Sequence, residues 1–430
     1  MQLKIDKLVY GGDGLARLPA DDQGPGKSVF VPFVLEGETV EAKIIEDKRS
    51  FARAELVSLL EAAPHRIQAG CPYYQRCGGC HYQHTDYKHQ LAIKADVLKE
   101  TLRRTAKLEL PCKLQIHVSP EWGYRNRTRL KVQTAPEFAL GYYRFRSHEL
   151  LPIEQCPVSS PLINQAITSL WQAGRDGKIG GCAREIELFA NAEDTAILAE
   201  VYCAPGTSRS DARKLSDNFA GFLLNASGMT IFEQAAFNST VEPKHLAAIG
   251  AESLDYKTAQ SSYRVSAGAF FQGYRFLVDR LLSLVTDGAA GQLALDLYAG
   301  VGLFSAVLAR SFAQVIAVEA SQTSYSDLSH NCGREVKAVR STTEKYLDQS
   351  PGLHPDLVVA DPPRGGLGEN VVRKLAGMDS PRVCYVSCDP STLARDLRTF
   401  VSLGYRINDA HLIDLFPQTF HIESVFHLAR

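Results

Sequence analysis

After about residue 256, short apolar runs that suit buried strands alternate with stretches that suit helices. The apolar runs are 293–298, 315–319, 356–360 and 382–387. A helix is expected at 303–310, and another after Pro390, where Leu393 and Leu397 form an apolar stripe. Apolar strands separated by helices are typical of a parallel sheet. The pattern therefore predicts an α/β domain over residues 256–430.

The first 60 residues carry a different pattern, in which short strands are separated by turn signals. Residues 29–34 and 40–45 have the apolar alternation of strands, and the glycine-rich segment 10–14 indicates a turn. Several short strands in so short a segment predict a small OB-like β-barrel. Barrels of this kind commonly bind single-stranded nucleic acid, so RNA binding is favoured over a barrel without a ligand.

Residues 61–255 mix both patterns and predict a central α+β domain. Residues 186–189 and 196–202 indicate a strand pair. Residues 84–108 have apolar positions at near-helical spacing and predict a helix. We expect the basic residues of this helix on its exposed side: Lys88, Lys94, Lys99, Arg103 and Arg104.

Lysine and arginine side chains alternate with aromatic rings between Trp122 and His148. Cations for phosphates beside rings for stacked bases are typical of an RNA-binding surface. The densest part holds Arg125, Arg127 and Arg129, which we expect to contact RNA. An ordinary β-hairpin with exposed arginines explains this segment alone equally well.

Three cysteines stand close together in the middle region, with the spacing C-x5-C-x2-C. They are Cys71, Cys77 and Cys80, and the best candidate for a fourth ligand is Cys156. Four cysteines suit either zinc or an iron–sulfur cluster. Zinc sites usually pair two short C-x-x-C units, and here only Cys77 and Cys80 form one. The uneven spacing therefore favours a [4Fe-4S] cluster.

The overall composition limits the classes of protein that remain. A net charge of −1 excludes a broadly basic nucleic-acid binder but not a local basic patch. The N-terminus has no apolar run and no stretch is long enough to span a bilayer, so we expect a cytoplasmic monomer without membrane contact. Ten cysteines in such a chain indicate metal or catalytic roles for the clustered ones rather than a disulfide scaffold.

Polar residues follow several of the predicted C-terminal strands, where α/β sheets bind their ligands. Cys388 lies between strand 382–387 and a helix, and a helix N-terminus favours the thiolate, so this residue is either a nucleophile or a small core residue. The turn with Gly300 and Gly302, followed by Glu319 at the end of the next strand, predicts a site for a nucleoside cofactor. Glu319 would accept hydrogen bonds from the ribose hydroxyls of this cofactor. The missing third glycine favours S-adenosylmethionine over NAD.

Several motifs together resemble the RNA uracil-5-methyltransferase family. They are GGDGLAR followed by VFVP, which resembles a TRAM domain, then DLYAGVG, DPPR, SCDPSTLARDL and HIESV. The resemblance implies a class I methyltransferase fold, with Cys388 as nucleophile and Glu423 as base. It also implies cofactor contacts from Gln272, Tyr298, Gly300, Gly302, Glu319 and Asp361. The family's bacterial 23S rRNA members usually have asparagine where Leu303 and Tyr274 stand, which puts those two positions in doubt as cofactor contacts.

The resemblance also bears on the RNA target. The cluster cysteines favour the branch that modifies 23S rRNA over the bacterial tRNA branch, which lacks them. Archaeal tRNA enzymes of the family carry them too, so tRNA remains an alternative. A non-enzymatic, iron–sulfur RNA-binding or redox-sensing protein is the other alternative. The intact set of Gly300, Gly302, Glu319, Cys388 and Glu423 argues against it.

Overall fold

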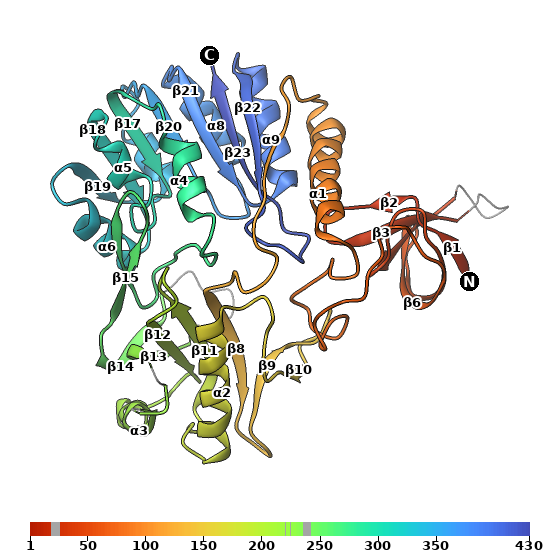
Figure 1. Ribbon diagram of the computed structural model, residues 1–430. Coiled ribbons are helices and arrows are strands. Elements are labelled where there is room, and N and C mark those ends of the chain that lie inside the picture. Colours follow the sequence, from red (N-terminus) through yellow and green to blue (C-terminus); the bar gives the residue numbers. More distant parts are fainter. Residues whose placement is uncertain (19–25, 220, 224, 235–241) are drawn as a thin grey trace.

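The computed structural model describes residues 1–18, 26–219, 221–223, 225–234 and 242–430. Figure 1 shows three parts: a small barrel at the N-terminus, a central sheet, and a larger α/β part that ends at the C-terminus. Within the described ranges, no helix is long and apolar enough to cross a membrane.

The N-terminal part is a six-stranded barrel-like sheet, as the sequence pattern predicts. Its strand order is β1-β5-β6-β4-β3-β2. Alternate residues of β4 and β5, such as Val29, Val31 and Val40, are fully buried and form its core with Ala52 and Ala54 of β6. The strands are β1 (Gln2–Lys4), β2 (Lys7–Leu8), β3 (Asp13–Arg17), β4 (Ser28–Pro32), β5 (Thr39–Asp47) and β6 (Phe51–Glu61).

Helix α1 (Tyr87–Thr101) follows the barrel and continues as a π-helical turn, η1 (Leu102–Ala106). The Asp86 side chain caps the N-terminus of α1, because it accepts a hydrogen bond from the backbone N–H of His89 at 2.9 Å. The prediction that Lys94 lies on the exposed side of this helix is wrong. Its Nζ is buried and donates to Asp414 Oδ1 at 2.6 Å and to the Phe416 carbonyl at 2.8 Å.

The central part is a seven-stranded sheet of order β10-β9-β8-β11-β12-β13-β14, with two helices. The predicted strand pair is confirmed as β11 and β12, which pair antiparallel. Helix α2 packs its apolar stripe, including Ile163, Ile167 and Leu170, into the core of this sheet. The elements are β8 (Arg127–Gln133), β9 (Ala139–Tyr143), β10 (Leu150–Pro152), α2 (Pro161–Arg175), β11 (Ala183–Ala190), β12 (Ile197–Cys203), α3 (Arg209–Phe219), β13 (Ala226–Glu233) and β14 (Lys244–Gly250).

The C-terminal part is built on an eight-stranded sheet of order β19-β18-β17-β20-β21-β23-β22-β7. Strand β23 is antiparallel to both neighbours, and β7 (Gln115–His117), from the middle of the chain, pairs parallel with β22 at one edge. The other strands are β17 (Gly291–Leu297), β18 (Phe312–Glu319), β19 (Val336–Arg340), β20 (Leu357–Ala360), β21 (Arg382–Ser387), β22 (Arg406–Ile413) and β23 (Glu423–Ala429).

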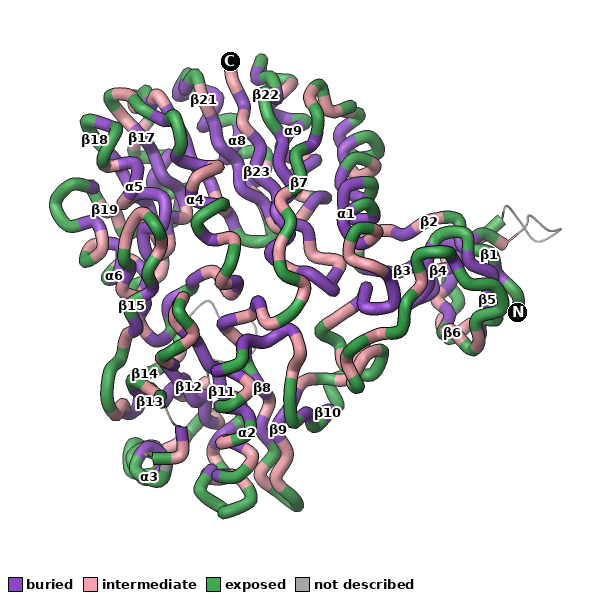
Figure 2. The backbone as a smooth tube through the Cα atoms, viewed as in Figure 1, coloured by how far each residue is buried: buried purple, intermediate pink, exposed green. Residues whose placement is uncertain are grey.

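Helices cover both faces of this sheet, and its central strands β20, β21 and β23 are buried along most of their length (Figure 2). One face carries α4 (Val278–Thr286), α5 (Ser305–Leu308) and α6 (Gln322–Cys332). The other face carries α1, α7 (Thr343–Asp348), α8 (Gly368–Gly377) and α9 (Pro390–Ser402). The helix expected at 303–310 is thus only the single turn α5. A hairpin of β15 (Ser253–Lys257) and β16 (Ser262–Ser266) precedes α4.

Candidate active site and cysteine cavity

The sheet brings Cys388 and Glu423 together, although 35 positions separate them in the sequence numbering. Cys388 directly follows β21, and Glu423 is the first residue of β23. In the antiparallel pairing of these strands Ser387 lies opposite Ser424, and the Ser424 hydroxyl donates to the Ser387 carbonyl at 3.2 Å. Cys388 and Glu423 therefore stand side by side at the same end of the sheet.

The cysteine also stands at the start of α9, as the sequence predicts. Asp389 caps this helix by accepting from the backbone N–H groups of Ser391 at 2.8 Å and Thr392 at 3.1 Å. The surroundings of the thiol act against this helix terminus. Burial, followed by the neighbouring carboxylates of Glu423 and Asp361, raises the pKa of the Cys388 thiol to about 12.

Two carboxyl groups near this thiol have raised pKa values themselves. Asp361 directly follows β20, and burial raises its pKa to about 7. Burial, with the nearby Asp361, also raises the pKa of Glu423 well above its ordinary value. Both shifts favour the protonated carboxyl group, and carboxyl groups with raised pKa values are frequent at functional sites.

Asp296 is a buried carboxyl group that sequence reasoning missed. It lies inside β17, is fully buried, and accepts from the Ser305 hydroxyl at 2.5 Å. Burial raises its pKa to about 7, and the neighbouring Asp361 acts in the same direction. The sequence could have indicated this residue, because an acidic side chain in the middle of an otherwise apolar strand is costly to bury unless it has a partner or a function.

The glycine turn after β17 and Glu319 are in contact. Glu319 accepts from the backbone N–H of Gly300 at 2.9 Å and from that of Ser321 at 2.7 Å. Tyr298, Gly300 and Gly302 all have positive φ, at 59°, 55° and 92°. Nothing lies within 4 Å of where a Cβ of Gly300 would stand, which leaves that stretch of backbone open to a ligand. The carboxylate keeps free lone pairs for ribose hydroxyls.

The second glycine of the turn serves packing. A Cβ at Gly302 would come within 2.8 Å of Cys332 Sγ and 2.9 Å of Leu328 Cδ1, both on α6. Its lack of a side chain therefore lets the turn approach the helix, which differs from the ligand approach expected from the sequence.

The two positions that depart from the family pattern are filled by packed side chains. Tyr274 is fully buried and stacks on Tyr124, with ring centroids 5.1 Å apart. Leu303 is buried too, and its carbonyl accepts from the Tyr263 hydroxyl at 2.9 Å. Gln272, the other predicted contact from this region, is half-buried two residues before Tyr274.

The four predicted ligand cysteines line one cavity of about 470 Å³, together with Arg125 and Tyr142. Burial raises the pKa of Cys77 to about 11 and that of Cys80 to about 12. In the part of the chain that the structure describes, no three Cys, His, Asp or Glu side chains lie close enough to share one metal ion. The structure thus brings the four cysteines to one cavity but not into the geometry of a single metal site.

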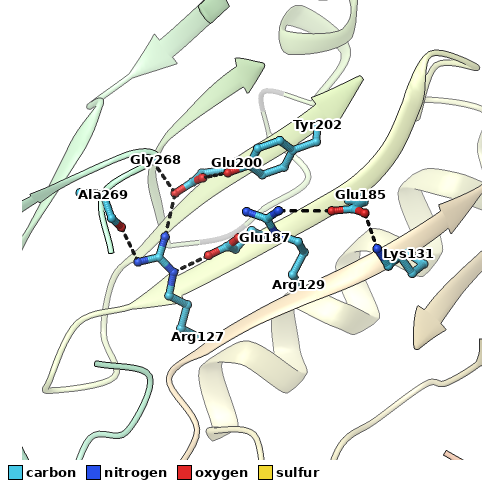
Figure 3. A network of polar contacts seen from close by, with 9 residues as sticks. All are labelled: Arg127, Arg129, Lys131, Glu185, Glu187, Glu200, Tyr202, Gly268 and Ala269. Atoms are coloured by element: carbon cyan, nitrogen blue, oxygen red, sulfur yellow. Dashed lines mark hydrogen bonds and ion pairs between the residues drawn. The ribbon is translucent and has the colours of Figure 1, made fainter. Parts of the chain in front are cut away.

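The three arginines predicted to contact RNA are not on one open surface. Arg127 is mostly buried and pairs with Glu187 and with Glu200, the latter at 3.3 Å, and it donates to the Ala269 carbonyl at 2.7 Å (Figure 3). Arg129 is 44% exposed and pairs with Glu187 at 2.5 Å and Glu185 at 3.4 Å. Arg127 therefore ties the central sheet to the loop after β16, and of these two arginines only Arg129 keeps a largely exposed side chain. An RNA contact of the three arginines stays a prediction.

Arg125 points to the cysteine cavity instead. Burial raises the pKa values of Cys77 and Cys80, and the Arg125 guanidinium works against this effect. Among the described residues, its side chain forms no ion pair with a carboxylate. A half-buried cation beside four cysteines suits a site whose ligands are thiolates.

The sheet order, the glycine turn with Glu319, and the acids at the strand ends define a class I, Rossmann-like methyltransferase. Comparison with known proteins narrows this class. The family model "tRNA (Uracil-5-)-methyltransferase" matches residues 86–349 and 352–430, and the TRAM domain model matches residues 1–57. The chain belongs to this family of S-adenosylmethionine-dependent RNA methyltransferases.

Relatives and solved structures agree with this assignment. An uncharacterized RNA methyltransferase of Aquifex aeolicus is 32% identical, over 99% of this chain and 97% of its own. One of Gloeobacter violaceus is 31% identical, over 99% and 95%. A tRNA (uracil-54, C5)-methyltransferase of Pyrococcus abyssi, solved with S-adenosyl-L-homocysteine, superposes over all of both chains with a TM-score of 0.76 and 23% identity. That likeness confirms the fold.

Proposed function

We propose that this enzyme methylates C5 of a uridine in RNA, with Cys388 as nucleophile and Glu423 as base. The observation that carries the proposal is the register of β21 and β23, which sets the thiol beside a buried carboxyl group at the ligand-binding end of the sheet. One thiol and one carboxylate around a base taken out of its stack are sufficient for this reaction.

The chemistry requires both groups. Uracil C5 is too weakly nucleophilic to attack a methyl sulfonium. When the Cys388 thiol has released its proton to solvent and its sulfur adds to C6, C5 gains carbanion character. S-adenosylmethionine supplies the electrophilic methyl group that C5 takes. Glu423 then removes the proton from C5, and the Cys388 sulfur leaves C6 to restore the ring.

The proposed cofactor contacts follow from the open backbone at Gly300. Glu319 would hold the ribose hydroxyls, Tyr298 and Gln272 would flank the ligand, and Asp361 would face the reacting centre. Gly302 supports this site through packing rather than by contact. We retain the domain limits 1–60, 61–255 and 256–430 as a proposal for the barrel, the central part and the methyltransferase part.

We also propose that Cys71, Cys77, Cys80 and Cys156 hold a [4Fe-4S] cluster. Support comes from the shared cavity and the cationic Arg125 on its wall. Such a cluster has four thiolate ligands and no open iron, so its role would be structural. Its binding would release the protons of the four thiols.

For the target, we propose 23S rRNA, on the strength of the cluster cysteines. The second candidate is tRNA, which is favoured by the fold shared with the Pyrococcus abyssi enzyme that acts on uracil-54 of tRNA. Total rRNA and tRNA from a strain that lacks this gene should be incubated with the enzyme and methyl-labelled S-adenosylmethionine, then mapped by mass spectrometry. 5-Methyluridine in 23S rRNA alone supports the first candidate, in tRNA alone the second, and in neither RNA refutes the proposed reaction.

A further inference from the structure

Two cysteines that the proposed function does not use have their sulfur atoms in contact. Cys182 lies directly before β11, and Cys203 is the last residue of β12, the antiparallel neighbour of β11. The thiol of Cys203 donates a hydrogen bond to the sulfur of Cys182, and the two sulfur atoms are 3.6 Å apart. Both residues belong to the central part of the molecule, whereas Cys388 and Glu423 belong to the methyltransferase part.

The sheet holds these two cysteines as neighbours. In the register of β11 and β12, Ala183 lies opposite Cys203. The backbone N–H of Ala204 donates to the Cys182 carbonyl at 2.8 Å, and that of Gln234 donates to the Cys203 carbonyl at 2.9 Å. Because the two backbones already lie side by side, rotation of the side chains is sufficient to bring the sulfurs to the bonding distance of about 2 Å.

The two thiols differ in their access to small molecules. Cys203 is fully buried in the core of the central sheet, and Cys182 is half-buried. Cys182 also lines a cavity of about 460 Å³, together with Asp211, Lys214 and several glycines. A small molecule in this cavity therefore meets the sulfur of Cys182 before that of Cys203.

The surroundings of Cys182 favour its thiolate. The hydrogen bond from Cys203 lowers the pKa of the Cys182 thiol to about 7, against the effect of burial, and it keeps the proton on Cys203, whose own pKa is raised. The Arg184 guanidinium donates to the Gly181 carbonyl at 2.8 Å and to the Ala183 carbonyl at 3.0 Å, which holds this cation beside Cys182. Partial exposure, a nearby cation and a second thiol are the features of a reactive cysteine.

We propose that Cys182 and Cys203 form a redox-active pair: Cys182 attacks low-molecular-weight disulfides, and Cys203 completes a reversible disulfide within the central sheet. The substrate of this site would be a small organic disulfide. The pair uses none of the residues proposed for methyl transfer, so the two proposals are tested separately.

Two thiol–disulfide exchange steps make up this reaction. The Cys182 thiolate attacks one sulfur of the small disulfide, so a mixed disulfide forms and one small thiolate leaves. The Cys203 thiol then gives up its proton, its sulfur attacks the Cys182 sulfur, and the second small thiolate leaves. The two cysteines lose two electrons and the small disulfide gains them. The two thiol protons end on the two small thiols that are released.

Oxidised glutathione is the probe for the test, which uses the full-length protein without oxygen to spare any iron–sulfur cluster. After the reaction, free thiols are blocked with iodoacetamide and a tryptic digest is analysed by mass spectrometry. Trypsin places Cys182 and Cys203 on separate peptides, 179–184 and 185–209. A disulfide should join these peptides, and dithiothreitol should separate them again. Absence of the joined peptides, or glutathione that stays on Cys182 of the unaltered protein, overturns the proposal.

Two variants and one internal comparison separate the roles of the cysteines. Cys203→Ala removes the second thiol, so Cys182 should accumulate as a stable mixed disulfide with glutathione. In Cys182→Ala the buried Cys203 should stay unmodified. Cys112 is the matched comparison in the same digests, because it is also half-buried but lies outside this cavity. Cys182 should react at least about threefold faster than Cys112.

Two results with these cysteines would overturn the proposal. One is an equal rate at Cys112 and Cys182, and the other is a folded Cys203→Ala protein without the mixed disulfide. If Cys203→Ala does not fold, the joined peptides of the unaltered protein decide the question alone.

Discussion

Cys388 illustrates what a short motif reveals and what it does not. The motif predicts its place between a strand and a helix correctly, and with it the favourable helix terminus. Burial and two carboxylates from other strands nevertheless raise the pKa of the thiol, against the effect of that terminus. Glu423 and Asp361 lie far from Cys388 in the chain, so only the folded sheet reveals their effect on its pKa.

Substitution of the two proposed catalytic residues should give opposite phenotypes with the same loss of turnover. Cys388→Ala should abolish both methylation and any covalent enzyme–RNA adduct. Glu423→Gln should still add the sulfur and accept the methyl group, but the sulfur cannot leave while C5 keeps its proton. A methylated RNA complex should therefore accumulate and survive denaturing electrophoresis. Absence of this complex in a folded, cofactor-binding Glu423→Gln enzyme would exclude Glu423 as the base.

The raised pKa values also predict the pH dependence of the reaction. Cys388 must lose its proton before it adds, and Glu423 must be ionised before it accepts one. The raised pKa values favour the neutral forms of both groups, so the reactive fraction grows as pH rises. Single-turnover methyl transfer should accelerate with pH, by up to about tenfold per unit between about pH 6 and pH 9. A rate that falls over this range, with RNA binding constant, would contradict the assignment.

The ion pairs of Arg127 and Arg129 could have been expected from the spacing of charged residues in the sequence. Residues two apart on a strand lie on the same face, and Glu185 and Glu187 have the same spacing on the neighbouring strand β11. Opposite charges that alternate with the same period predict cross-strand ion pairs. The even spacing of the arginines therefore indicated internal pairing at least as strongly as RNA contact.

At the level of elements, the apolar strands were predictable and several helices were not. Strand β21 has the limits expected from its β-branched and aromatic residues, and β18 begins three residues earlier than expected. The run 303–310 yields only one helical turn, because its first residues belong to the glycine turn. Helix α1 was found, but its buried lysine was not. The partner of that lysine, Asp414, lies more than 300 residues away.

The ion pair between Lys94 and Asp414 fixes α1 against the loop after β22. Burial lowers the pKa of Lys94, while Asp414 favours its charged form. Lys94→Met should lower the free energy of unfolding by about 3–5 kcal/mol, because it leaves the Asp414 carboxylate buried without its partner. Chemical denaturation measures this change.

Two further variants test this explanation. Lys88→Met, on the exposed side of the same helix, should change the free energy of unfolding by less than about 0.5 kcal/mol. Asp414→Asn added to Lys94→Met should restore part of the loss, because the unpaired charge is removed. Equal effects of Lys88→Met and Lys94→Met would show that the buried pair contributes nothing.

At the scale of the whole molecule, the cysteine loop joins all three parts. Tyr74 packs edge-on against Phe33 of the barrel, with centroids 5.4 Å apart. The Tyr82 backbone N–H donates to the Gln418 carbonyl of the methyltransferase part at 3.0 Å, and the Gly78 N–H donates to the carbonyl of Tyr143 on β9 at 3.1 Å. Sequence spacing predicted the cysteines, but not that their loop lies at this junction.

Loss of the proposed cluster should therefore weaken the contacts between the parts more than it disturbs the cofactor site. Cys156→Ser removes the ligand that lies between β10 and α2, outside the loop that holds the other three cysteines. It should lower iron from about four per chain, lower the melting temperature and reduce RNA methylation, while S-adenosylmethionine binding changes little. Anaerobic purification with metal analysis, calorimetry and cofactor titration measure these effects.

Cys112→Ser, at a half-buried cysteine outside the cavity, is the control and should keep its iron. Stoichiometric zinc without iron in the unaltered protein, or full iron in Cys156→Ser, would refute the four-cysteine cluster. The three parts would then be held together at this loop by polar and aromatic contacts alone.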